Sequence, residues 1–119
     1  MTATTLFTPY RLAYASLALA LLAACLTVSG PWWSAVAFGL APDLALLVGA
    51  SKGLEKGQLH PRAVPLYNAL HTFVGPIVVG IAFVLLGLSP LGPLAWALHI
   101  AWDRTLGYGL RTPDGFQRS

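Results

Sequence analysis

The chain has 119 residues, of which 56% are hydrophobic and only 9% are charged. Because soluble domains carry about 25% charged residues, this composition excludes an ordinary water-soluble globule and indicates a protein whose solvent is lipid. The formal net charge is +3, but no Lys/Arg cluster with interleaved aromatic residues occurs, so we exclude nucleic-acid binding.

Four apolar segments follow one another, and each is close to the roughly 20 residues that a helix needs to cross a bilayer. The expected spans cover residues 12–29, 33–50, 63–88 and 91–110. Gly30-Pro31 ends the first span, Pro42 lies inside the second and Gly75-Pro76 interrupts the third, because proline and glycine break or kink helices. We therefore expect residues 1–119 to form one domain, an all-α four-span transmembrane helical bundle.

The first span has a second interpretation. Leu22-Ala23-Ala24-Cys25 also fits a bacterial lipoprotein cleavage box after a short basic region, and signal segments resemble short apolar spans. More apolar sequence follows Cys25 where a lipoprotein would have a polar linker, so we favour a membrane span.

Charge placement predicts the orientation of the bundle. The basic residues outside the spans fall in three regions: before the first span, between the second and third, and after the fourth. They are Arg11; Lys52, Lys56 and Arg62; and Arg111 and Arg118. The loops around Pro31 and Pro90 carry no charge. Since cytoplasmic loops carry the excess of Lys and Arg, we expect a multi-pass protein of the inner (plasma) membrane with both termini cytoplasmic. Its partner is the lipid bilayer, and a homo-oligomer is compatible with the sequence.

A small set of polar residues interrupts these apolar segments. They are Asp43, Asn68, His71, His99, Asp103 and Arg104. Asp43, His71 and Asp103 each lie about two helical turns from the cytoplasmic ends of their spans, and His99 shares a helix face with Asp103 because residues i and i+4 stack. Polar groups are costly in hydrocarbon and normally face the bundle interior. We therefore expect these side chains to converge, with Arg104 near the interface, where it reaches towards headgroups or pairs with a carboxylate.

Three interpretations of this cluster are open. In the leading one the residues form a hydrogen-bonded polar knot, and the protein has a structural or interaction role. In the second, Asp43, His71, His99 and Asp103 bind a divalent metal such as zinc and the protein is a membrane hydrolase, with Asn68 orienting a ligand. In the third, the cluster is part of a small carrier or proton path. The sequence does not decide whether the protein is an enzyme.

The same residues carry a family resemblance. Its strings are Ala41-Pro42-Asp43, Leu66-Tyr67-Asn68-Ala69-Leu70-His71-Thr72, His99-Ile100-Ala101-Trp102-Asp103-Arg104 and Gly107-Tyr108-Gly109-Leu110-Arg111. In this order they resemble domain of unknown function 4260, a family of small uncharacterised bacterial integral membrane proteins. The resemblance implies a four-span membrane protein and no particular activity. A looser likeness to membrane-bound metal-dependent hydrolases is one of pattern alone.

Overall fold

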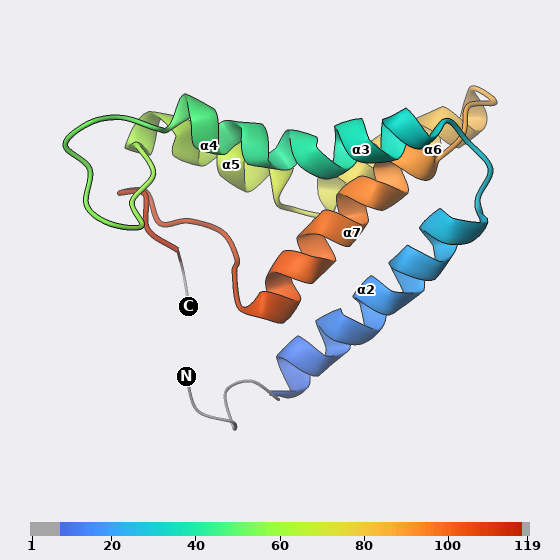
Figure 1. The fold of residues 1–119 in the computed structure, drawn as a ribbon, viewed down its shortest axis with the longest axis horizontal. Coiled ribbons are helices and arrows are strands. Elements are labelled where there is room, and N and C mark those ends of the chain that lie inside the picture. The colour runs from blue at the N-terminus through green and yellow to red at the C-terminus, as the bar shows by residue number, and fades with distance from the viewer. Residues whose placement is uncertain (1–7, 118–119) are drawn as a thin grey trace.

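The computed structural model describes residues 8–117, and within them the regular structure is helical, with no strand. This confirms the all-α prediction for the described residues. The helices are α2 (Pro9–Thr27), α3 (Trp32–Leu40), α4 (Leu44–Val48), α5 (Val64–Leu70), α6 (Val74–Leu85) and α7 (Leu91–Leu106), and two 3-10 turns cover Ala41–Asp43 and Pro61–Ala63 (Figure 1).

Helix α7 is the centre of the packing. It contacts α2, α3 and α6, and α2 runs beside it for most of its length (Figure 1). The α7 face turned towards α3 carries small residues, and a Cβ added at Gly92 would lie 2.5 Å from the Phe38 ring. Small residues allow helices to approach closely. The close approach brings α3, and the segment that follows it, next to the polar residues of α7.

The expected second span is not one continuous helix. It is divided into α3, the 3-10 turn Ala41–Asp43 and α4. Pro42 is buried in the middle of this turn. Proline has no N–H to donate and its ring clashes with the preceding turn, so the helix tightens into a 3-10 turn there. The interruption leaves Asp43 at the junction, with its side chain turned towards His71 and His99.

The expected third span is also broken, at residues 71–73 between α5 and α6, with a bend of 47°. A broken helix leaves carbonyls without partners. Two α7 side chains donate to them: Trp96 Nε1 to the Leu70 carbonyl at 2.8 Å and an Arg104 Nη to the His71 carbonyl at 3.0 Å. The break is therefore stabilised from the neighbouring helix.

Helix α7 ends four residues before the predicted boundary of the fourth span. Gly107 follows it in the left-handed conformation, with φ of 93°, and the Tyr108 N–H donates to the Asp103 carbonyl at 2.8 Å. This is the Schellman arrangement in which glycine is favoured. The tail then turns back, and Arg111 and Gln117 form an isolated antiparallel bridge.

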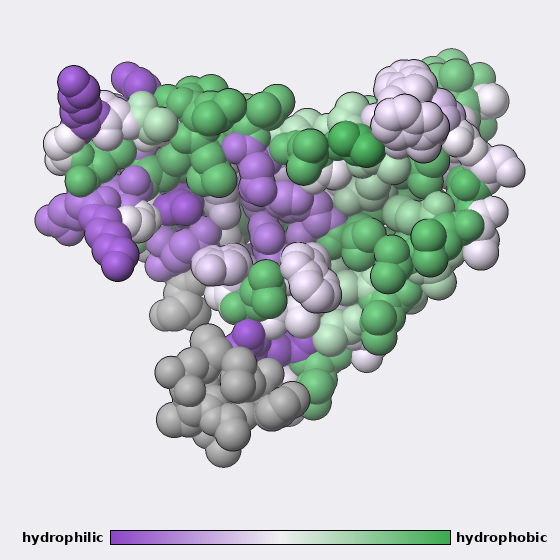
Figure 2. Space-filling view, viewed as in Figure 1, coloured by the Kyte–Doolittle hydropathy of each residue, from purple (hydrophilic) through white to green (hydrophobic). Residues whose placement is uncertain are grey.

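The surface is unusually apolar. On the face in Figure 2, hydrophobic residues cover most of the right half, while hydrophilic residues extend from the left edge into the centre. By length and composition, one helix in the described part of the chain, α2, could cross a bilayer, and the bent pair Pro61–Leu70 and Val74–Leu85 would supply a second if it counts as one span. The remaining apolar helices are shorter.

Candidate metal centre

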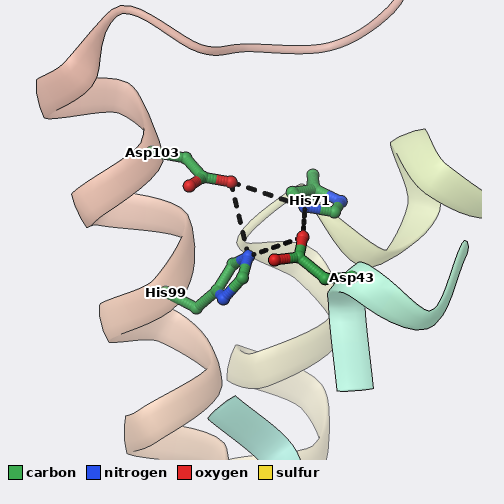
Figure 3. A group of neighbouring side chains, drawn as sticks. All are labelled: Asp43, His71, His99 and Asp103. Atoms are coloured by element: carbon green, nitrogen blue, oxygen red, sulfur yellow. Dashed lines mark ion pairs between the residues drawn. The ribbon is translucent and has the colours of Figure 1, made fainter. Parts of the chain in front are cut away.

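Four of the polar residues singled out in the sequence meet at one place (Figure 3). Asp43 comes from the 3-10 turn after α3, His71 is the residue that ends α5, and His99 and Asp103 lie one turn apart on α7. Each offers one ligand atom, and these four atoms lie within 4.8 Å of one another. Both helix interruptions are thus at the site.

The four contacts between the histidines and the carboxylates are nearly equal. His71 Nε2 lies 3.4 Å from Asp43 Oδ1 and 3.5 Å from Asp103 Oδ2. His99 Nε2 lies 3.2 Å and 3.4 Å from the same two oxygens. Each nitrogen therefore faces both carboxylates, and each carboxylate oxygen faces both nitrogens.

The other ring nitrogen of each histidine is already engaged with the backbone. His71 Nδ1 lies 2.7 Å from the Tyr67 carbonyl oxygen, and His99 Nδ1 lies 2.8 Å from the Gly39 carbonyl oxygen. A carbonyl only accepts hydrogen bonds, so both Nδ1 atoms are the protonated donors. In the neutral imidazoles the two Nε2 atoms therefore carry lone pairs, and these point at the carboxylate oxygens.

This arrangement leaves both Nε2 atoms without a hydrogen-bond partner, although both are buried. The site is closed on the histidine side, where the His71 side chain is 3% exposed, and open on the other, where the Asp43 side chain is 48% exposed. Buried polar atoms without partners are rare and costly in native proteins. A cation between the four atoms would satisfy all of them.

The nitrogen–oxygen spacing of the four atoms suits a four-coordinate transition-metal ion. Zinc lies about 2.0–2.1 Å from histidine nitrogen and about 2.0–2.2 Å from carboxylate oxygen, so the edges of a tetrahedral site are about 3.3–3.5 Å long. The four nitrogen–oxygen distances are 3.2–3.5 Å, and the nitrogen–nitrogen and oxygen–oxygen distances lie within 4.8 Å. Ligating histidines also donate their second ring N–H to a carbonyl or carboxylate in most metal sites, as His71 and His99 do here.

Tyr67 supports the site, although the sequence analysis assigned it no role. Its ring stacks on the His71 ring with centroids 3.9 Å apart and an interplanar angle of 13°, and its backbone carbonyl accepts the His71 Nδ1 hydrogen bond. The Tyr67 hydroxyl in turn accepts a hydrogen bond from Gln117 at 2.9 Å. The signal for this role was the spacing of four residues, which places Tyr67 and His71 on the same helix face.

Asn68 and Arg104 lie beside the cluster without joining it. The Asn68 side chain exchanges two hydrogen bonds with the Arg111 backbone, donating to its carbonyl at 3.1 Å and accepting from its N–H at 2.7 Å. Arg104 donates to the His71 carbonyl. Asn68 thus holds the tail, and Arg104 holds the backbone of a residue that belongs to the site.

Comparison with known proteins identifies a family and no described activity. No curated protein and no solved structure gives a significant match. A family model described as "Domain of unknown function (DUF4260)" matches residues 9–119, which include the whole of the four-residue cluster. The chain therefore belongs to the DUF4260 family.

Proposed function

We propose that this protein binds one divalent transition-metal ion, zinc in the first place, through Asp43, His71, His99 and Asp103. One observation carries the proposal: two buried Nε2 atoms without hydrogen-bond partners face the same two carboxylate oxygens at 3.2–3.5 Å. Nitrogen and carboxylate donors together suit zinc, iron or manganese, whereas magnesium and calcium prefer oxygen-only sites. Two carboxylates also neutralise a divalent charge in apolar surroundings.

The polar-knot interpretation is less well supported by the same distances. A knot without metal needs imidazolium rings that donate Nε2–H to the carboxylates. Charge-assisted bonds of this kind are usually about 2.7–2.9 Å long, and one N–H points at one oxygen. Here each nitrogen stands 3.2–3.5 Å from two oxygens, which favours a fifth atom between the four.

The open side of the site favours hydrolysis as the chemistry. A metal ion held by four protein ligands would need a fifth coordination position, on this exposed side, to activate water or to polarise a carbonyl or phosphoryl oxygen as a Lewis acid. The Asp43 side chain is 48% exposed, so water and substrate would reach the centre from its side. The second Asp43 oxygen would be the proton acceptor for that water, while the hydrogen bonds to the Tyr67 and Gly39 carbonyls would hold His71 and His99 in place.

We propose further that the protein spans the bilayer of the inner membrane four times, with both termini on the cytoplasmic side. Three contacts support this topology at the charged end. Arg111 donates to the Gly57 carbonyl and the Leu59 N–H donates to the Gly115 carbonyl, which joins the basic loop to the tail. Arg11 donates from Nε to the Thr105 carbonyl, which places the start of α2 beside the end of α7.

The opposite end of the bundle is uncharged, and its two loops are joined to each other. Ser89 donates from its hydroxyl to the Ser29 carbonyl at 2.6 Å. Helix α7 is only 16 residues long, about 24 Å against the roughly 30 Å of hydrocarbon, so the bilayer would be thinned or the helix ends extended by loop residues. Reporter fusions after Ser119 and between Ser29 and Trp33 should lie on opposite sides, and the same side for both would contradict the four-span arrangement.

Metal analysis of the purified protein tests the metal proposal. We expect one zinc per chain in the wild type and loss of at least 80% of it in His71→Ala and His99→Ala. The chain offers a matched control, because its third histidine, His60, lies in the basic loop outside the cluster, where its ring accepts a hydrogen bond from the Arg62 N–H. His60→Ala should keep its metal. Folded wild-type protein that takes up no zinc, iron or manganese would refute the proposal.

A further inference from the structure

We infer that Arg111 and Gln117, in the tail that follows α7, are positioning residues of the metal centre and act on it through Tyr67. This role rests on the proposed metal function, because it concerns how tightly the four ligands hold the ion. Neither tail residue is one of those ligands. Both side chains contact the Tyr67 side chain, and Tyr67 in turn contacts His71. The tail therefore reaches the metal centre by way of Tyr67.

Tyr67 holds the His71 ring in two ways. Its backbone carbonyl accepts the His71 Nδ1 hydrogen bond at 2.7 Å, which sets the ring nitrogen that faces the carboxylates. Its own ring stacks on the imidazole with centroids 3.9 Å apart and planes 13° from parallel, which restricts rotation of the imidazole about its Cβ–Cγ bond. The direction of the His71 Nε2 lone pair therefore depends on where the Tyr67 ring lies.

The tail fixes the Tyr67 ring at two points. The Arg111 guanidinium carbon lies 4.8 Å from the centre of the ring, within the range of a cation–π interaction. The Gln117 side-chain amide donates to the Tyr67 hydroxyl at 2.9 Å. One contact is made with the face of the ring and the other with its far end, so together they oppose both tilting and sliding of the ring over His71.

The two tail residues are themselves held in place. Arg111 and Gln117 are partners in the antiparallel bridge, so their side chains start from neighbouring backbone positions. The Arg111 guanidinium donates to the Gly57 and Gly115 carbonyls at 3.0 Å and 2.8 Å. Gln117 Oε1 accepts from the Gly109 N–H at 3.0 Å. Figure 1 shows this tail beside the loop between α4 and α5, which supplies a fixed base for the contacts with Tyr67.

Loss of this support should weaken metal binding without abolishing it. Groups that orient a metal ligand from behind typically change metal affinity 10–100-fold when they are removed. We expect the zinc dissociation constant, measured by chelator competition in a neutral maltoside detergent, to rise about tenfold in Gln117→Ala and in Arg111→Met. The visible absorption bands of the Co²⁺-loaded protein, which report ligand geometry, should shift in both variants. At saturating zinc both should keep one zinc per chain, because the four ligands are unchanged.

The chain offers a matched control for each tail residue. Gln58 also fastens the loop to the tail, donating to the Asp114 carbonyl at 2.9 Å. Arg62 also donates from its guanidinium to a backbone carbonyl, that of Val48. In the part of the chain that the structure describes, neither side chain bonds to Tyr67 or stacks on it. Gln58→Ala and Arg62→Met should therefore change the zinc dissociation constant less than twofold.

A double-mutant cycle tests whether the effect of Gln117 passes through the Tyr67 hydroxyl. Tyr67→Phe removes the same hydrogen bond from the other side and keeps the ring. The two single variants and the double variant should therefore all raise the zinc dissociation constant by the same factor, about tenfold, whereas about 100-fold in the double variant would refute this route. The cycle also keeps the test decisive if Arg111→Met does not fold after the Gly57 and Gly115 carbonyls lose their donor.

Proton NMR of metal-free protein with isotope-labelled histidine separates the positioning role from the metal proposal. The stack should shift the His71 ring protons upfield in the wild type, and Gln117→Ala and Arg111→Met should move them towards those of an unstacked imidazole; His71→Ala assigns the signal. Wild-type ring-proton shifts and wild-type zinc affinity in both variants would overturn the positioning role and leave the metal centre standing. Wild-type protein that binds no zinc would overturn the metal centre, and unchanged His71 ring protons in the variants would then overturn the positioning of His71 as well.

Discussion

Substituting Asp103 by asparagine is the sharpest test of the electrostatics of the cluster. Its effect on the free energy of unfolding should depend on whether zinc is bound. Without metal, two carboxylate oxygens lie within 4.8 Å of each other. At an effective dielectric constant of about 20–40, which allows for the exposure of Asp43, their repulsion is about 2–3.5 kcal/mol. Asp103→Asn removes this repulsion. Its amide N–H could also donate to a partnerless Nε2 atom, a bond worth about 0.5–1.5 kcal/mol.

Zinc should stabilise the wild type more than it stabilises Asp103→Asn. At a free zinc concentration about 100 times its dissociation constant, binding stabilises the wild type by about 2.7 kcal/mol. If losing one ligand weakens binding 100-fold, the same zinc stabilises Asp103→Asn by only about 0.4 kcal/mol. Zinc should therefore reduce the advantage of the variant by about 2.3 kcal/mol.

The assay is the free energy of unfolding of both proteins in mixed micelles at pH 8.5, above the ordinary titration range of histidine, with chelator and with zinc. Glu55→Gln is the control, because this loop carboxylate is exposed and lies outside the cluster; it should respond to zinc as the wild type does. A polar knot predicts a different pattern. Removing one partner of a buried charge pair costs about 3–5 kcal/mol, so a variant less stable than the wild type under both conditions, with no zinc effect on either protein, would refute the reasoning.

Two further substitutions test the supports of the site. Asn68→Ala removes both side-chain bonds to the Arg111 backbone, and we expect about 1–3 kcal/mol lower stability and faster proteolysis of the tail at unchanged zinc content; a tail as resistant as in the wild type would contradict this. Gly75→Ala places a Cβ 2.5 Å from the Trp96 ring, and we expect a loss of about 1–3 kcal/mol from overpacking. Gly80→Ala, whose Cβ would meet its nearest neighbour at 3.4 Å, should cost much less, and equal losses in the two variants would count against the Trp96 clash.

The four-residue cluster could be anticipated from the sequence because depth in an apolar helix is a matter of counting. Asp43, His71 and Asp103 stand at similar distances from charged loops, and His99 follows from the spacing of four residues on α7. The cost of polar groups in hydrocarbon supplies the reason for them to meet. The structure brings these four residues together. The other two polar residues singled out in the sequence, Asn68 and Arg104, lie beside them.

The roles of the neighbours could not be anticipated, because they depend on contacts between distant segments. Asn68 binds the backbone of Arg111, 43 residues away, and Arg104 binds the His71 carbonyl, 33 residues away. No local pattern encodes either contact.

The break in the third apolar segment was expected at Gly75-Pro76 and lies instead at residues 71–73. Pro76 falls in the first turn of α6, where a missing N–H costs no hydrogen bond. The position of the break is set by Trp96 and Arg104, whose donors satisfy the carbonyls that it frees. Tertiary contacts from α7 thus override the local signal of the Gly-Pro pair.

The break between α5 and α6 helps to form the four-residue cluster. A continuous third helix would keep the His71 backbone inside the regular ladder, whereas ending α5 at His71 turns its ring towards Asp43 and Asp103. Broken helices are tolerated at membrane depth only where other groups satisfy the freed backbone. Helix α7 supplies those donors and also two of the four ligands. One helix therefore both permits the break and uses it, so a substitution that removes the Trp96 or Arg104 bond to the end of α5 would alter the stability of the fold and the geometry of the four-residue cluster together.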